Sequence, residues 1–83
     1  MKLPRDLSGR VLAALLRQYG YREVRQTGSH LRLVSTLKGA EHHVTIPMHD
    51  SLKVGTLSAI LSDLASYLEI DKETLAERLF NSR

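Results

Sequence analysis

The spacing of the apolar residues changes twice along this chain of 83 residues, and the change restricts the folds that the chain can adopt. Between residues 8 and 19, apolar side chains recur every three or four positions, as they do on one face of a helix. Between residues 30 and 46 they alternate with polar side chains, as in strands with one buried face. From residue 56 the helical spacing returns. The pattern therefore predicts helices on both sides of a group of strands.

Two longer helices are predicted, one before and one after the strands. The first runs over residues 8–19, because Ser8 is a favourable N-cap and Gly20 stands where a helix C-terminus often becomes left-handed. The second runs over residues 56–68 and starts at Thr56. Its apolar residues form one continuous stripe suited to packing on a sheet, namely Leu57, Ile60, Leu61, Leu64 and Leu68.

A short third helix is predicted from Asp71, which is placed to act as its N-cap. Ile70 precedes the cap and Leu75 lies inside the helix, which is the arrangement of a hydrophobic staple. A chain of this length has room for one core. We therefore expect a single domain over residues 1–83, in which residues 70–83 form an appended C-terminal helix.

Three short strands are predicted between the two longer helices. The first runs over residues 21–26 and ends before Gly28, the second over residues 30–35, and the third over residues 42–46. Pro47 stops the third strand, because proline has no N–H to donate to a ladder. The predicted order is α-β-β-β-α with an added helix, an α+β fold in which a three-stranded antiparallel sheet packs on two helices. The other face of the sheet is expected to be open.

Composition excludes several classes of function. The chain is 42% hydrophobic and 25% charged, as ordinary globular domains are. It has no cysteine, which excludes disulfides, thiolate metal sites and thiol nucleophiles. No apolar run has the length of a membrane span, and the polar start of the chain, with Pro4, is unlike a secretory signal. We therefore expect a cytoplasmic protein with no membrane partner.

The charge of the chain is unevenly distributed. The formal net charge is +3, but residues 1–68 hold nine Lys and Arg against five Asp and Glu, whereas residues 69–83 hold three against four. A polyanion would therefore find its electrostatic attraction in the first two thirds of the chain. The ordinary alternative is a solvated basic surface with no ligand.

A histidine follows Gly-Ser in the segment RQTGSHLRL, where a turn leads into the second predicted strand. Because the apolar residues of 30–35 must face the core, strand alternation turns His30 and Arg32 to the open face. Gly28 permits a tight turn with positive φ, and Ser29 adds a hydroxyl and an N–H beside the imidazole. His30 is therefore a candidate functional residue, against the alternative of a surface histidine without a role.

A second unusual segment, IPMHDSLKVGTLSAIL, runs from the third strand into the second long helix. His49 follows Pro47 closely, Lys53 adds a positive charge, and Gly-Thr at Thr56 opens the helix. The free N–H groups and the dipole of a helix N-terminus favour an anion. The segment is therefore a candidate phosphate-binding site, although Gly-Thr alone also fits a simple helix start.

Together these segments resemble the HicA toxin family of bacterial and archaeal toxin–antitoxin systems. The resemblance lies in YGYREV, in RQTGSH with its Gly28-Ser29-His30, in the IPMH segment and in GTLSAIL. It implies a fold like that of double-stranded-RNA-binding domains and a ribonuclease that cuts messenger RNA and arrests growth. It also implies that His30 is catalytic and that a HicB-like antitoxin binds and neutralises the protein.

The chemistry needs no cofactor and no metal ion. Histidine has an ordinary pKa of about 6.5, which suits general acid–base catalysis of the attack of a 2′-hydroxyl on the adjacent phosphate. His30 is the predicted catalyst, with His43 and His49 as candidate partners, and Arg25 or Arg32 would stabilise the charge on phosphorus. The residues predicted to contact RNA are Arg25, Ser29, Arg32, His49, Lys53 and Thr56.

Three alternatives remain open from the sequence. A non-catalytic module would use the same fold to hold RNA by its shape and 2′-hydroxyl groups. A metal site would have to gather His30, His42, His43 and His49, yet His42 and His43 point to opposite faces of a strand. A domain that binds only proteins would need no basic face. The predicted site holds no metal.

Overall fold

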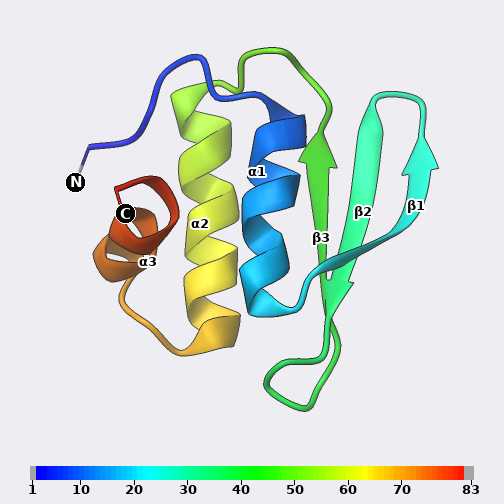
Figure 1. Ribbon diagram of the computed structural model, residues 1–83, viewed down its shortest axis with the longest axis vertical. Helices are drawn as coiled ribbons and strands as arrows, with labels where there is room; N and C mark the ends of the chain where they lie inside the picture. Colours follow the sequence, from blue (N-terminus) through cyan, green and yellow to red (C-terminus); the bar gives the residue numbers. More distant parts are fainter. Residues whose placement is uncertain (1, 82–83) are drawn as a thin grey trace.

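The computed structural model describes residues 2–81 and confirms the α+β architecture. The elements in chain order are α1 (Gly9–Leu15), the 3-10 turn η1 (Leu16–Tyr19), β1 (Arg22–Thr27), β2 (His30–Ser35), β3 (His42–Pro47), α2 (Val54–Leu68) and α3 (Lys72–Phe80). The strands form one antiparallel sheet in the order β1-β2-β3. In Figure 1, α1 and α2 lie side by side next to β3, and β1 lies at the margin of the molecule.

The predicted caps of the first helix are confirmed. The Ser8 hydroxyl accepts a hydrogen bond from the Val11 N–H at 3.1 Å, and Gly20 ends the helical segment at φ 81°. The helix is not uniform, because its last turn, η1, has the tighter 3-10 geometry. Val11, on the expected apolar face, is 49% exposed. Local hydrogen bonds thus set both ends of this segment, while packing selects which residues are buried.

The second long helix begins earlier than predicted. α2 starts at Val54 rather than Thr56, because the backbone carbonyl of Lys53 already accepts from the Leu57 N–H at 2.9 Å. The predicted apolar stripe is correct, since all five of its residues are buried. The N-cap of α3 is also confirmed, because Asp71 Oδ2 accepts from the Thr74 N–H at 3.1 Å.

The register of β1 differs from simple alternation. The strand begins at Arg22, one residue later than predicted, and the N–H of the buried Tyr21 before it donates to the Leu16 carbonyl at 3.4 Å. Glu23 pairs with Leu33 but Arg25 pairs with Arg32, so Val24 is an extra residue in a β-bulge. Cross-strand partners share a face, so Arg25 lies on the face that carries Arg32, and the bulge puts Arg22 on that face as well. β3 extends one residue beyond the prediction and includes Pro47.

A chain of polar side chains joins β3 to α2 at the end of the sheet remote from the β1–β2 hairpin. The Tyr21 hydroxyl lies 2.6 Å from His42 Nδ1, and His42 Nε2 lies 3.1 Å from Asp63 Oδ1. With the proton of a neutral imidazole on Nε2, both contacts are satisfied hydrogen bonds. The His42 ring also stacks on Tyr67 at 4.7 Å. Burial, followed by the charges of Tyr67 and Asp63, raises the pKa of Tyr21 well above its ordinary value.

We expect Tyr21→Phe to alter the stability of the protein at alkaline pH. Because the pKa of Tyr21 is raised in the folded state, its contribution is fully present below the ordinary tyrosine pKa of about 10 and is lost as pH rises above it. Urea unfolding of the wild type should therefore show a falling free energy above about pH 10. The free energy of unfolding of Tyr21→Phe should fall less steeply over this range. Near pH 7 it should be about 1 kcal/mol lower than that of the wild type, because the hydrogen bond is lost.

Tyr19→Phe is the matched control, because Tyr19 is a partly buried tyrosine at the edge of the core. A change that both variants share would come from the loss of any tyrosine hydroxyl and not from the contact of Tyr21 with His42. Equal slopes for Tyr21→Phe and the wild type would contradict the role given to the Tyr21 hydroxyl.

None of the helices within residues 2–81 combines the length and the apolar character needed to span a bilayer.

Candidate functional site

The β1–β2 hairpin presents His30 at the surface. Gly28 has φ 56°, which confirms the left-handed turn predicted for it, and Thr27 pairs with His30 across the turn. His30 is the first residue of β2 and is exposed. The turn therefore places the imidazole at the end of the sheet, on the face that the helices leave open.

His30 lies in a shallow hollow of about 260 Å³ on this face, lined by Arg25, Thr27, His30, Arg32 and Thr45. The sheet register explains why these five residues share the hollow. Arg25 pairs with Arg32, Thr27 with His30, and Arg32 with Thr45, and cross-strand partners lie on the same face. Two guanidinium groups, an imidazole and two hydroxyls therefore converge on one space. Such a set of donors suits an anion with several oxygen atoms, such as a phosphodiester.

The two segments singled out in the sequence meet in space through their backbones. The Met48 N–H donates to the Ser29 carbonyl at 2.6 Å, which joins the hairpin turn to the loop after β3. The His49 carbonyl accepts from the Gly9 N–H at 3.0 Å, which joins the same loop to the start of α1. Ser29 and His49 are both exposed, but neither lines the hollow.

The predicted phosphate-binding helix start lies elsewhere. Lys53 is the N-cap residue of α2 and Thr56 lies in its first turn, and neither lines the hollow around His30. In Figure 1, α1 lies between the start of α2 and the β1–β2 hairpin. The structure therefore brings Arg25 and Arg32 together with His30 and leaves Lys53 and Thr56 apart from them.

The other two histidines have their own partners. His42 lies on the helix side, bonded to Tyr21 and Asp63, and His43 Nε2 lies 3.2 Å from Glu41 on the opposite side of the strand. Over residues 2–81, no three side chains of His, Cys, Asp or Glu come together as a metal site would require. The four histidines therefore do not form one cluster.

The sequence reasoning missed Thr27 as a lining residue. A two-residue turn of Gly and Ser between alternating segments indicates a tight hairpin, and the residues flanking such a turn are cross-strand partners. That signal is enough to pair Thr27 with His30 from the sequence alone. Thr45 lies directly opposite Arg32 on β3 and also lines the hollow.

The family model of the HicA toxin of bacterial toxin–antitoxin systems matches residues 9–65. The chain belongs to the HicA toxin family. The matched range contains α1, the whole sheet and most of α2, and hence the hairpin with His30 and the loop with His49. Membership gives the chain the role of a toxin with a toxin–antitoxin partner. No curated protein and no solved structure is significantly similar to the chain.

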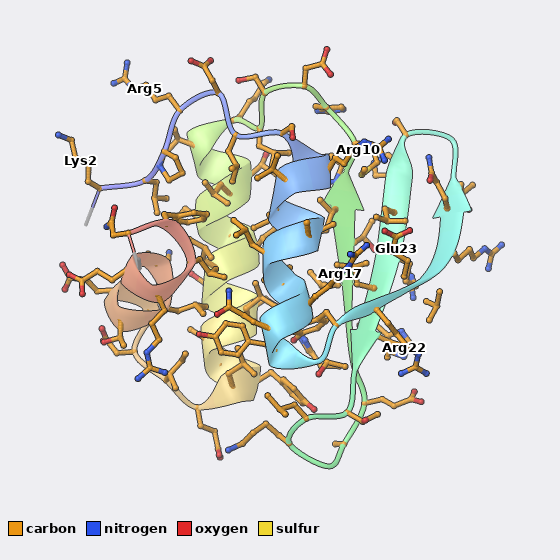
Figure 2. The ribbon with its side chains drawn as sticks, in the orientation of Figure 1. Lys2, Arg5, Arg10, Arg17, Arg22 and Glu23 are labelled. Carbon is orange, nitrogen blue, oxygen red and sulfur yellow. The ribbon has the colours of Figure 1, made fainter. Side chains whose placement is uncertain are left out.

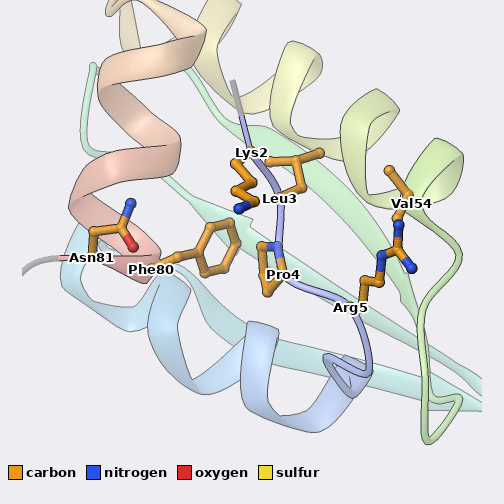
Figure 3. Close-up of a pocket in the computed structure, with 7 residues that line it drawn as sticks. All are labelled: Lys2, Leu3, Pro4, Arg5, Val54, Phe80 and Asn81. Atoms are coloured by element: carbon orange, nitrogen blue, oxygen red, sulfur yellow. The ribbon is translucent and has the colours of Figure 1, made fainter.

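A second, larger hollow of about 610 Å³ lies between the N-terminal segment, the start of α2 and the end of α3. Figure 3 shows the Phe80 ring pointing toward Pro4, with Lys2 nearby and Arg5 close to Val54. Of its lining residues, only Val54 belongs to the part of the chain that matches the HicA toxin model. The hollow around His30 is therefore the candidate site for the function shared by the HicA family.

Proposed function

We propose that this HicA family toxin is a metal-independent ribonuclease that cleaves messenger RNA in the cytoplasm, with His30 as a general acid–base catalyst. The proposal rests on family membership and on one structural observation, which is the convergence of Arg25 and Arg32 around an exposed His30. A toxin acts on a target that the cell cannot do without, and messenger RNA is such a target. The same hollow offers the charge that a phosphodiester requires.

In the proposed reaction, His30 takes the proton from a ribose 2′-hydroxyl, and the 2′-oxygen attacks the adjacent phosphorus. The bond from phosphorus to the 5′-oxygen then breaks, and that oxygen receives a proton from a second acid. The products are a 2′,3′-cyclic phosphate and a 5′-hydroxyl. Negative charge grows on the phosphoryl oxygens as the new bond forms, and Arg25 and Arg32 are placed to stabilise it.

One imidazole does not readily supply both the base and the acid, so a second group is needed. His43 contacts Glu41 and does not line the hollow, so we assign it no role. His49 lies on the loop that is bonded to Ser29 through Met48. Of the two predicted partners, His49 is therefore the one we propose as the second acid.

Cleavage of a defined messenger RNA by the purified protein tests the proposal. We expect cleavage to persist in excess EDTA and to leave 2′,3′-cyclic phosphate ends. The same RNA carrying 2′-O-methyl groups should bind but remain intact, because its 2′-oxygen has no proton to lose. Cleavage of the methylated RNA, or a requirement for added magnesium or zinc, would reject this mechanism. Binding without any cleavage would instead favour the non-catalytic RNA-binding module.

Salt should weaken RNA binding, and the effect should depend on Arg32. Each phosphate contact to single-stranded RNA contributes about −0.7 to the slope of log affinity against log salt concentration. We expect Arg32→Gln to make this slope shallower by about 0.7 for the 2′-O-methyl RNA. Arg5→Gln is the matched control, because Figure 2 places Arg5 on the far side of the molecule from β1. An equal change in both variants would show that the hollow is not a specific phosphate site.

We further propose that the antitoxin is HicB-like and that it inhibits the toxin by covering the open face around His30 and Arg32. A protein on this face would block access to the imidazole and would occupy the guanidinium groups that phosphate needs. Modification of His30 by a histidine reagent should therefore slow when the antitoxin is bound. A complex in which His30 reacts as fast as in the free toxin would exclude inhibition by occlusion.

A further inference from the structure

The outer edge of β1 is an unpaired strand edge in the part of the chain that the structure describes. Within residues 2–81, β1 is the first strand in the sheet order and has a neighbour only on the side of β2. Every residue of β1 is exposed, in contrast to the largely buried β2. Half of the N–H and C=O groups of such an edge strand point away from its neighbour and can pair with another strand. Figure 1 shows that β1 lies at the margin of the molecule, where another chain can approach it.

The opposite edge of the sheet is less suitable for another strand. α1 and α2 both pack against β3. Pro47, at the end of β3, has no N–H to donate. Gly9 lies so close to the Pro47 carbonyl that a Cβ at Gly9 would overlap its oxygen. The sheet therefore has one edge that is open to strand addition.

The charges of the β1 side chains favour some binding partners of this edge over others. Arg22 and Arg25 both lie on the open face and give it positive charge at the margin of the sheet. A second copy of the chain would bring these arginines close to their equivalents, and this repulsion between like charges opposes self-pairing. A strand whose acidic side chains point to the open face would meet the opposite charge of these arginines.

We propose that the free edge of β1 is the docking site for an extended acidic segment of the antitoxin, which adds a fourth strand to the sheet. The proposal rests on the proposed function, because it assigns the occupant to the protein that inhibits the ribonuclease. An added strand lies about 4.8 Å from β1, and alternate side chains of it point to the open face. A carboxylate there lies next to Arg25, which also lines the hollow around His30. The strand would therefore compete with RNA for one guanidinium group without having to touch His30.

A synthetic probe tests the edge directly. The probe is a short labelled peptide in which glutamate alternates with valine, and binding is measured by fluorescence anisotropy to the otherwise intact His30→Ala chain. Hydrogen exchange of the backbone amides reports where the probe binds. We expect slower exchange within β1, with little change in β3. A peptide with lysine in place of glutamate should bind at least about tenfold more weakly, because it would face Arg25 with like charge.

Two controls separate strand pairing from charge attraction alone. The same acidic peptide with methyl groups on every backbone nitrogen keeps its charge but cannot form a ladder, so it should bind about tenfold more weakly. Arg25→Glu should weaken the unmodified peptide about tenfold, while Arg5→Glu, the same charge change on the far side of the molecule, should have a small effect. Equal binding of the methylated and unmodified peptides would overturn the proposal.

The results also distinguish this proposal from the ribonuclease proposal. Binding is measured on a chain without the catalytic imidazole, so it does not depend on cleavage. RNA cleavage by the wild type together with no protection of β1 would overturn strand docking and leave the ribonuclease in place. Protection of β1 together with no cleavage by the wild type would support the docking edge and reject the enzyme. If single-stranded RNA, and not the acidic peptide, slows exchange in β1, the edge belongs to the RNA site and strand docking is wrong.

Discussion

His30→Ala is expected to abolish RNA cleavage and growth arrest while the protein stays folded. A general acid–base residue contributes about 10²- to 10⁴-fold to a rate, so initial rates on a defined messenger RNA should fall by at least two orders of magnitude. Stability should change little, because His30 is exposed and its loss leaves no cavity in the core. Cleavage rates and thermal unfolding by circular dichroism measure both effects.

His43→Ala is the matched control for this variant. It removes the same ring from the same face of the sheet, at a position outside the hollow that contains His30. We expect it to retain cleavage. A folded His30→Ala protein that cleaves at the wild-type rate would reject His30 as the catalyst. Equal losses of cleavage in both variants would show that substitution anywhere on the open face impairs cleavage, and this would also contradict a specific role of His30.

Gly9→Ala is expected to destabilise the protein more than any other small substitution considered. Gly9 is buried at the start of α1, where an added Cβ would overlap the Pro47 carbonyl oxygen and lie 3.2 Å from Ile46 Cγ2. The carbonyl belongs to the sheet and cannot rotate away. Overpacking of this kind costs about 3 kcal/mol, which lowers the melting temperature of a domain of this size by on the order of 15 °C.

The same substitution should also disturb the candidate site. The Gly9 N–H donates to the His49 carbonyl, so a shift of α1 moves the loop that follows β3. Gly55→Ala is the control, because within residues 2–81 a Cβ at Gly55 would meet no atom within 4 Å outside its chain neighbours and the backbone of its own helix. Alanine is a better helix former than glycine, so Gly55→Ala should raise the stability by about 0.5 kcal/mol. Melting of Gly9→Ala at the wild-type temperature would show that the contact between α1 and β3 is not close-packed.

Features that depend on neighbouring residues in the chain could be predicted from the sequence alone. The N-caps at Ser8 and Asp71 are confirmed, because each is a hydrogen bond between a side chain and a backbone N–H three residues away. The positive φ of Gly28 is likewise a local property of the turn. The apolar stripe of α2 follows from helical periodicity, and the order of helices and strands follows from the change of period along the chain.

The tertiary structure alone decided how these local elements meet. The bulge at Val24 depends on the pairing of β1 with β2, and it places Arg22 and Arg25 on the same face of the sheet, where simple alternation would put them on opposite faces. The separation of Lys53 and Thr56 from His30 depends on α1 lying between them in the folded chain. The sequence thus determined the elements and the position of His30 on a strand. The presence of Thr45 in the hollow around His30, and the distance of the α2 start from it, were decided by strand register and helix packing, because those contacts join segments that are remote in the chain.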